Sequence, residues 1–227
     1  MRDVTEMCTV QFRTCDAVLF DLDGVLVDSN PVYERHWHVW AKQHGVSFDH
    51  IAAVHHGRPA RQTIRLVAPH LDAELEACLY NDRVAADNDV KGVGAYEGVP
   101  ELLRALHSQY WAIVTSAQRE LALRFLQRLD LPAPSVLVTS DDVVNGKPSP
   151  DPYLKAASGL GRDPRRCVVI EDAPAGIAAA KAAGAFVVAI PATNPPDMLH
   201  EADALVSCIA NLSIIQTEAG LTVSWAS

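Results

Sequence analysis

The 227-residue sequence has no uninterrupted apolar run that approaches the ~20 residues needed to cross a bilayer. The segment from Met1 to Gln11 lacks the apolar core of a secretory signal peptide. Disulfide signals are missing too, because the five cysteines are scattered, odd in number and without a Cys-x-x-Cys pair. We therefore expect free thiols in a reducing cytoplasm and no membrane partner.

Positive charge is scarce in this sequence. It carries 19 lysines and arginines against 28 aspartates and glutamates, a formal net charge of −9. Since no basic stripe is available to neutralise a nucleic-acid backbone, we expect no nucleic-acid partner. An acidic protein that handles an anionic ligand must concentrate positive charge locally, through a metal ion, a lysine or backbone amides.

The bulk composition is that of a packed globular protein, with 49% hydrophobic and 21% charged residues. The length suffices for one core domain, alone or with a small insertion. Nothing in the sequence demands a dimer, so we expect a monomer.

The chain is organised around the stretch from Ala17 to Ser29, which reads AVLFDLDGVLVDS. Its first four residues form an apolar run that predicts a buried strand. The strand ends at Asp21 and Asp23, which point to the same side because residues i and i+2 of an extended segment share a face. Gly24 then allows a turn. Two such carboxylates are either ordinary turn residues or ligands of a hard cation such as Mg²⁺.

Residues 30–92 show helical patterns without strand-like alternation. Asn30 and Pro31 fit an N-cap followed by proline at the first helical position, and this helix ends at Gly45. Further helical patterns cover residues 51–55, 61–67 and 73–86. We therefore expect a small all-helical domain inserted after the first strand.

From Gly92 onward, strand-like and helical segments alternate, which predicts an α/β fold with a doubly wound, Rossmann-like parallel sheet. The expected strands after the first are residues 111–114, 135–139, 167–170, 186–190 and 204–206. The expected helices are residues 100–107, 120–129, 151–159, 175–183 and 197–201. Residues 1–14 are expected to form a loosely held leader, and the residues after Cys208 receive no assignment.

The domain division follows from this reading. The core would comprise residues 1–29 and 93–227, and the helical insertion residues 30–92. Two linkers, residues 26–30 and 91–96, would join the parts, and the glycines of the second favour a hinge there.

Three further motifs follow predicted strands, whose carboxyl ends collect at one edge of a parallel sheet. Thr115 and Ser116 offer hydroxyls and amides for a phosphate oxygen, or cap the next helix. Lys147, between a glycine and a proline, is either a solvated loop residue or a compact cation at the site. Glu171 and Asp172 either complete a metal site or cap a helix.

Together these motifs resemble the haloacid dehalogenase (HAD) superfamily of phosphotransferases. The pattern D-x-D-G-x-x-x-D-S beginning at Asp21 is similar to its first motif. Thr115 with Ser116, Lys147, and Glu171 with Asp172 follow in the order of motifs two, three and four. Residues 171–180 (EDAPAGIAAA) resemble the fourth-motif segment almost residue for residue, and the resemblance covers residues 16–207.

This resemblance implies a phosphatase that works through an aspartyl-phosphate intermediate. Asp21 would be the nucleophile, and Asp23 the general acid and base, with a raised pKa. Lys147 would bridge Asp21 and a phosphoryl oxygen. Thr115 or Ser116 would help to bind the phosphate.

The resemblance also implies Mg²⁺ as the cofactor. The carboxylates of Asp21 and Asp172 and the backbone carbonyl of Asp23 would hold the ion, with Glu171 in or next to that shell. The ion would let an anionic nucleophile approach an anionic phosphate.

The helical insertion lies where type C1 caps occur in this superfamily, and such a cap selects the substrate. Its candidate substrate contacts are His56, Gly57 and Arg58. The sequence H-G-R before a helix is similar to the caps of glycerol-phosphate and deoxysugar-phosphate phosphatases. We therefore expect a small phosphorylated metabolite, a sugar or polyol phosphate, as the substrate, and the natural one stays open.

Two other functions remain in view. One is a β-phosphoglucomutase-type mutase, which shares both aspartates. In that subgroup a histidine lies four residues after the serine or threonine of the first motif, where this sequence has Tyr33. The other is a non-catalytic HAD-like binding protein, and the presence of every motif residue argues against it.

Overall fold

The computed structural model describes residues 10–55, 58–87, 89, 91–217 and 220–226. Its centre is a six-stranded sheet with the strand order β6-β5-β2-β7-β8-β9. The strands are β2 (Ala17–Phe20), β5 (Trp111–Val114), β6 (Val136–Val138), β7 (Cys167–Glu171), β8 (Phe186–Ala189) and β9 (Ala204–Leu205). Each strand runs parallel to its neighbours, so the predicted doubly wound α/β core is confirmed.

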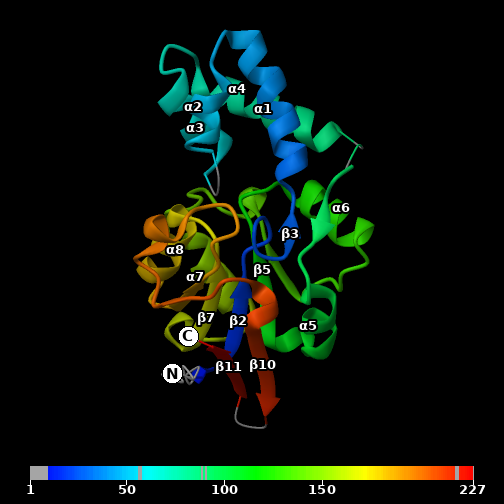
Figure 1. The fold of residues 1–227 in the computed structure, drawn as a ribbon, viewed down its shortest axis with the longest axis vertical. Helices are drawn as coiled ribbons and strands as arrows, with labels where there is room; N and C mark the ends of the chain where they lie inside the picture. Colours follow the sequence, from blue (N-terminus) through cyan, green and yellow to red (C-terminus); the bar gives the residue numbers. More distant parts are fainter. Residues whose placement is uncertain (1–9, 56–57, 88, 90, 218–219, 227) are drawn as a thin grey trace, which may run out of the picture.

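Successive residues of the central strand β2 pack against two different layers of helices. Val18 and Phe20 belong to an apolar cluster with α5 and α6, whereas Ala17 and Leu19 belong to a cluster with α7 and α8. The helices are α5 (Val99–Ala105), α6 (Arg119–Arg128), α7 (Asp151–Gly159) and α8 (Pro174–Ala182). Figure 1 shows the two pairs on opposite sides of the sheet. Because both faces are covered, the strands read as continuous apolar runs.

Four helices form a separate layer beyond the carboxyl edge of the sheet (Figure 1). They are α1 (Asn30–His44), α2 (Phe48–Ala52), α3 (Ala60–Val67) and α4 (Ala73–Ala86). Trp37 of α1 stacks on Tyr80 of α4 with ring centroids 4.1 Å apart, and both side chains are buried. Four helices are present as expected, but Ser29 rather than Asn30 is the N-cap of α1, and α2 covers Phe48–Ala52 instead of the predicted residues 51–55.

A short antiparallel ribbon joins the helical layer to the sheet. The chain enters the layer after β3 (Val27–Asp28) and returns through β4 (Gly94–Ala95), and these two strands pair with each other. On this basis we propose the division into a core of residues 1–29 and 93–227 and a helical cap of residues 30–92.

A second, three-stranded antiparallel sheet, with the order β1-β11-β10, was not predicted. Its strands are β1 (Val10–Cys15), β10 (Leu212–Thr217) and β11 (Gly220–Ala226). The prediction of a loosely held leader is wrong for residues 10–14, and residues 1–9 lie outside the described residues. Residues 10–13 do alternate between apolar and polar side chains, but this strand signal is only four residues long, and residues 10–14 are all exposed.

Two further expectations, on a short helix and on the cysteines, can be compared with the structure. The predicted helix at residues 197–201 is a 3-10 turn, Pro196–Leu199. Four of the five cysteines lie among the described residues, and all four are free thiols, as expected. No helix in the described part of the chain is both long and apolar enough to span a membrane.

Candidate active site

Asp21 directly follows the central strand β2, at the carboxyl edge of the sheet. Its backbone N–H donates to the carbonyl of Ile170 in β7 at 3.0 Å, which continues the pairing of the two strands. Gly24 then turns the chain with φ +85°. A Cβ at this glycine would lie 2.0 Å from an oxygen of Asp172, so only glycine lets the turn approach that carboxylate.

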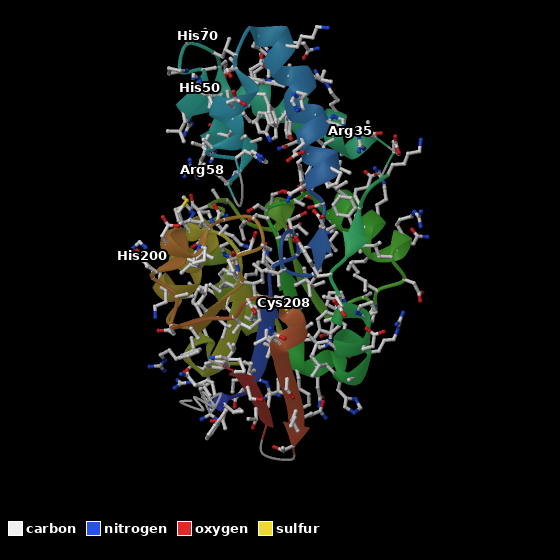
Figure 2. The ribbon with its side chains drawn as sticks, in the orientation of Figure 1. Arg35, His50, Arg58, His70, His200 and Cys208 are labelled. Atoms are coloured by element: carbon white, nitrogen blue, oxygen red, sulfur yellow. The ribbon has the colours of Figure 1, made fainter. Side chains whose placement is uncertain are left out.

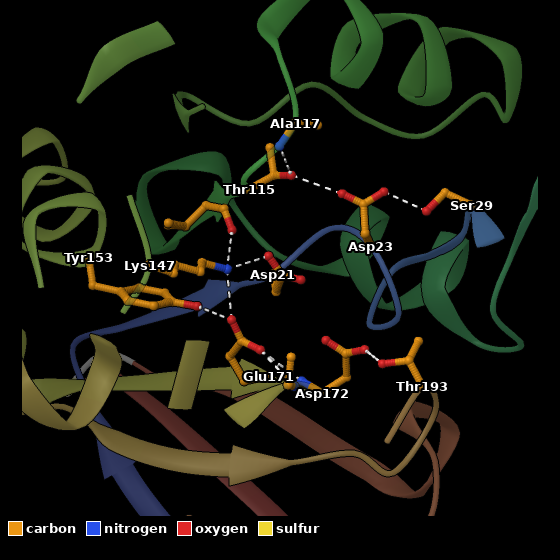
Figure 3. Close-up of polar contacts among 12 residues, drawn as sticks. Asp21, Asp23, Ser29, Thr115, Ala117, Lys147, Tyr153, Glu171, Asp172 and Thr193 are labelled. Carbon is orange, nitrogen blue, oxygen red and sulfur yellow. Dashed lines mark hydrogen bonds and ion pairs between the residues drawn. The ribbon is translucent and has the colours of Figure 1, made fainter. Parts of the chain in front are cut away.

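Lys147 reaches Asp21 from the loop before α7, and its side chain is buried. Its ammonium donates to Asp21 Oδ1 at 2.5 Å, Glu171 Oε1 at 2.7 Å and the carbonyl of Val114 at 3.1 Å (Figure 3). An ammonium has three donors, so all are used. The expected contact of Lys147 with Asp21 is therefore present, whereas contact with a phosphoryl oxygen requires one of the three bonds to be exchanged.

Glu171 and Asp172 end β7, and both are buried. Glu171, Asp172 and Asp21 each offer a carboxylate oxygen within 4.8 Å of the others. Glu171 accepts hydrogen bonds at both oxygens, from Lys147 and Tyr153 at Oε1 and from the backbone of residues 172 and 173 at Oε2. The carboxylate of Asp172 has fewer hydrogen-bond partners than that of Glu171. Thr193 donates to its Oδ2, but its buried Oδ1 has no hydrogen-bond partner among the described residues.

Burial and mutual repulsion shift the pKa values of this acidic cluster. Burial raises the pKa of Asp21 to about 8, an effect that Lys147 opposes and Glu171 reinforces. Burial, followed by repulsion from Glu171 and Asp21, places the pKa of Asp172 well above its usual range. Burial alone would lower the pKa of Lys147, but the carboxylates of Asp21 and Glu171 raise it well above its usual range.

The cluster therefore lacks positive charge. Among the described residues, three buried carboxylates share the single ammonium of Lys147. A divalent cation would offset the remaining charge and would satisfy the open Oδ1 of Asp172. The oxygen-only donor set and this unpartnered oxygen fit a hard cation.

Asp23 is held by two hydroxyl groups. Ser29 donates to its Oδ1 at 2.5 Å and Thr115 to its Oδ2 at 2.9 Å. Burial raises the pKa of Asp23, which these two hydrogen bonds oppose, and the raised pKa agrees with the expectation. The hydroxyl of Thr115 is thus directed at Asp23, while Ser116 lines the adjacent cavity without a side-chain hydrogen bond to a described residue.

A cavity that is partly open to solvent lies between the sheet edge and the helical layer. The core contributes, among others, Asp21, Asp23, Lys147 and Asp172, but not Glu171. The helical layer contributes, among others, Tyr33, Trp37, Arg58, Tyr80 and Asn81. Arg58 lies at the side of the cap that faces the core (Figure 2), and its guanidinium has no partner among the described residues. The other two candidate cap contacts, His56 and Gly57, lie outside the described residues.

Several residues at the site were not singled out from the sequence. Ser29 supports Asp23, Tyr153 supports Glu171, and Thr193 supports Asp172. Ser29 belongs to the first motif and was readable as part of it. Tyr153 faces inward from α7, where a buried aromatic is also expected for packing alone, and Thr193 lies in a loop with no periodic signal.

The parallel α/β core, its acidic edge and the helical cap over a shared cavity define a class of capped α/β enzymes. Within that class, the chain belongs to the haloacid dehalogenase-like hydrolases, whose family model matches residues 15–184. The resemblance drawn from the sequence is thereby confirmed.

Known proteins of this family are similar over most of the chain. Hexitol phosphatase A of Escherichia coli (strain K12) is 37% identical over 91% of this chain and 97% of its own length. Glycerol-1-phosphate phosphohydrolase 2 of Saccharomyces cerevisiae is 36% identical over 82% of this chain and 78% of its own. CbbY from Rhodobacter sphaeroides, solved in complex with phosphate, shares the fold with a TM-score of 0.72 at 23% identity, covering 87% of this chain and 96% of its own.

Replacing Gly24 by alanine tests the close approach of the turn to Asp172. A left-handed residue other than glycine loses roughly 1–2 kcal/mol, and here the new Cβ also collides with the carboxylate. Gly45→Ala is the matched control, since Gly45 has φ +64° and nothing within 4 Å of its added Cβ. In urea denaturation without metal, Gly24→Ala should lose clearly more free energy of unfolding than Gly45→Ala. Equal losses would contradict the proposed steric constraint.

Proposed function

We propose that this protein is a Mg²⁺-dependent phosphatase that hydrolyses a small sugar or polyol phosphate through an aspartyl-phosphate on Asp21. One observation carries the proposal. The carboxylate of Asp21 lines the cavity, with one oxygen held by Lys147 and the other accepting no hydrogen bond from the described residues. Asp23, which can handle a proton, lines the same cavity two residues away.

The ion would be held by the carboxylates of Asp21 and Asp172 and by the backbone carbonyl of Asp23. The charge deficit of the cluster and the open oxygen of Asp172 support this assignment. When bound, Mg²⁺ neutralises charge on the nucleophile and on the transferring phosphoryl group.

The residues of this chain then divide the reaction between them. Oδ2 of Asp21 attacks the phosphorus, and the bond from phosphorus to the substrate oxygen breaks. Asp23, protonated at this stage, gives its proton to the leaving alkoxide. In the second half, Asp23 takes a proton from water, which attacks the phosphorus and releases inorganic phosphate from Asp21. Ser116, which lines the cavity, would bind phosphoryl oxygens together with the backbone amides that follow Asp21 and Ser116.

The hydroxyl groups of Ser29 and Thr115 keep Asp23 aimed at the leaving group. Both donate to its carboxylate, so they fix its orientation through each half of the reaction. Burial favours the protonated form that the first step needs. Closure of the cap over the cavity would exclude bulk water from the reaction.

A sugar or polyol phosphate fits the described walls of the cavity. Aromatic residues Tyr33, Trp37 and Tyr80 suit the carbon skeleton of a sugar, and Asn81 and Arg58 offer donors to its hydroxyls. The relatives named for hexitol and glycerol-1-phosphate hydrolysis support the same substrate class. We further propose a monomer that works in the cytoplasm.

A mutase is the second candidate. A Thermotoga maritima structure described provisionally as a β-phosphoglucomutase is 31% identical, with a TM-score of 0.60, and covers 84% of this chain and 94% of its own. Against it, Tyr33 stands at the cavity where that subgroup has a histidine. Incubation with β-glucose 1-phosphate separates the two, because a mutase yields mainly glucose 6-phosphate and a phosphatase free phosphate.

Asp21→Asn tests the nucleophile. Phosphate release from a panel of sugar and polyol phosphates, measured with Mg²⁺, should fall by more than ~10³-fold because the amide oxygen is a poor nucleophile. Asp197→Asn, an equal change of charge on the exposed surface, is the control and should stay active. If both variants turn over the panel at the wild-type rate, the nucleophile assignment is wrong.

Asp23→Asn tests the proton transfer. A sugar alkoxide needs a proton as it leaves, whereas p-nitrophenolate does not, so the variant should lose ~10²–10⁴-fold with a sugar phosphate and much less with p-nitrophenyl phosphate. Steady-state kinetics on both substrates measure the difference. The same loss with both leaving groups would rule out the acid role.

Arg58→Ala tests the cap contact. Loss of a charge-assisted hydrogen bond to a substrate hydroxyl should raise KM for a sugar phosphate about tenfold or more and leave p-nitrophenyl phosphate little changed. Arg61→Ala is the control, because Arg61 pairs with the exposed Glu74 at 3.5 Å. An Arg58 variant that behaves like the Arg61 variant would remove Arg58 from the substrate site.

A further inference from the structure

We infer that Tyr153 and Glu171 form a buried bracket that positions Lys147 against the nucleophile Asp21, and that Glu171 serves this bracket rather than the metal ion. The inference rests on the proposed function, since it assigns how the reactive carboxylate is held. Neither Tyr153 nor Glu171 lines the cavity among its described residues, so both are positioning residues.

The bonding capacity of Glu171 is full. A carboxylate has about four lone-pair sites. Oε1 accepts from Lys147 Nζ at 2.7 Å and from the Tyr153 hydroxyl at 2.8 Å. Oε2 accepts from the backbone N–H groups of Asp172 at 2.9 Å and Ala173 at 3.1 Å. Glu171 therefore has no site left for a cation, in contrast to Asp172, whose Oδ1 is open.

Tyr153 contacts both partners of the ion pair. Its hydroxyl donates to Glu171, and its ring lies under the ammonium of Lys147, with Nζ 5.1 Å from the ring centroid. An ammonium at this distance is attracted to the face of the ring. The side chain is fully buried on α7, so packing leaves it little freedom to move away.

The neighbouring helix α8 is shaped around the same carboxylate. A Cβ at Gly176 would lie 1.6 Å from Glu171 Oε1 and 2.4 Å from Oε2, far inside contact distance. The glycine lets the first turn of α8 press against Glu171, while Tyr153 holds it from α7. Glu171 is thus seated between two helices, and its position decides where the ammonium of Lys147 lies.

The test is Tyr153→Phe, which removes only the hydroxyl and keeps the ring. We expect kcat for a sugar phosphate to fall about tenfold, since a hydrogen bond to a charged group is lost, while KM stays near the wild-type value. Tyr110→Phe is the matched control. Tyr110 also carries a cation over its ring, that of Arg162 at 5.7 Å, but lies away from the site. A Tyr153 variant with the kcat of the Tyr110 variant overturns the inference.

A second measurement needs no activity. The Mg²⁺ dissociation constant of the substrate-free protein is measured by calorimetry for Glu171→Gln and Asp172→Asn. The glutamine has one acceptor oxygen, which can serve either Lys147 and Tyr153 or the two backbone N–H groups, and it lacks the charge. We therefore expect lower kcat with Mg²⁺ affinity close to wild type, whereas Asp172→Asn should weaken Mg²⁺ binding at least tenfold. Equal weakening in both variants would make Glu171 a metal ligand and overturn the inference. The Mg²⁺ binding measurement needs no substrate. It therefore tests the role assigned to Glu171 even if the proposed phosphatase function is wrong.

Discussion

The active site depends on one buried ammonium group. Nζ of Lys147 bonds to residues at the ends of β5, β2 and β7, which are adjacent in the sheet: Val114, Asp21 and Glu171. An unpaired buried charge typically destabilises a protein by about 3–5 kcal/mol, so the ammonium and its carboxylates require one another. The ion pairs at this edge therefore link the ends of three strands and orient Asp21, the proposed nucleophile.

The parallel sheet explains why this arrangement was readable from the sequence. Asp21, Thr115 and Glu171 each follow or end a buried apolar strand, and parallel strands bring such residues to one edge. The types of these residues and their order along the chain then indicated the HAD family. The helical insertion was equally readable, because α1 to α4 show helical patterns with no strand-like alternation between them.

What the sequence did not reveal has physical causes. The strand β1 alternates between apolar and polar residues only over Val10 to Arg13, and it is exposed over residues 10–14, so this short signal marked no buried side. The alternation of Leu221, Val223 and Trp225 in β11, all buried, was a readable signal of a strand. Supporting contacts such as Thr193 to Asp172 and Tyr153 to Glu171 depend on which side chains meet across 18 to 21 residues of chain. Local secondary-structure propensity carries no information on such side-chain contacts.

The pairing of β1 with β11 affects the order in which the chain folds during its synthesis. Cys15 of β1 lies opposite Leu221 of β11, so about 200 residues must be made before the two strands can meet. Closing so long a loop is slow, and contacts between distant segments form late. On the ribosome, the segments that carry Asp21, Lys147 and Glu171 emerge well before β11 does. The sheet edge that carries the proposed active site can therefore assemble while β1 still lacks its partner strand. In the nascent chain, the segment most exposed to mispairing is then the unpaired β1, at the end of the molecule opposite the proposed active site.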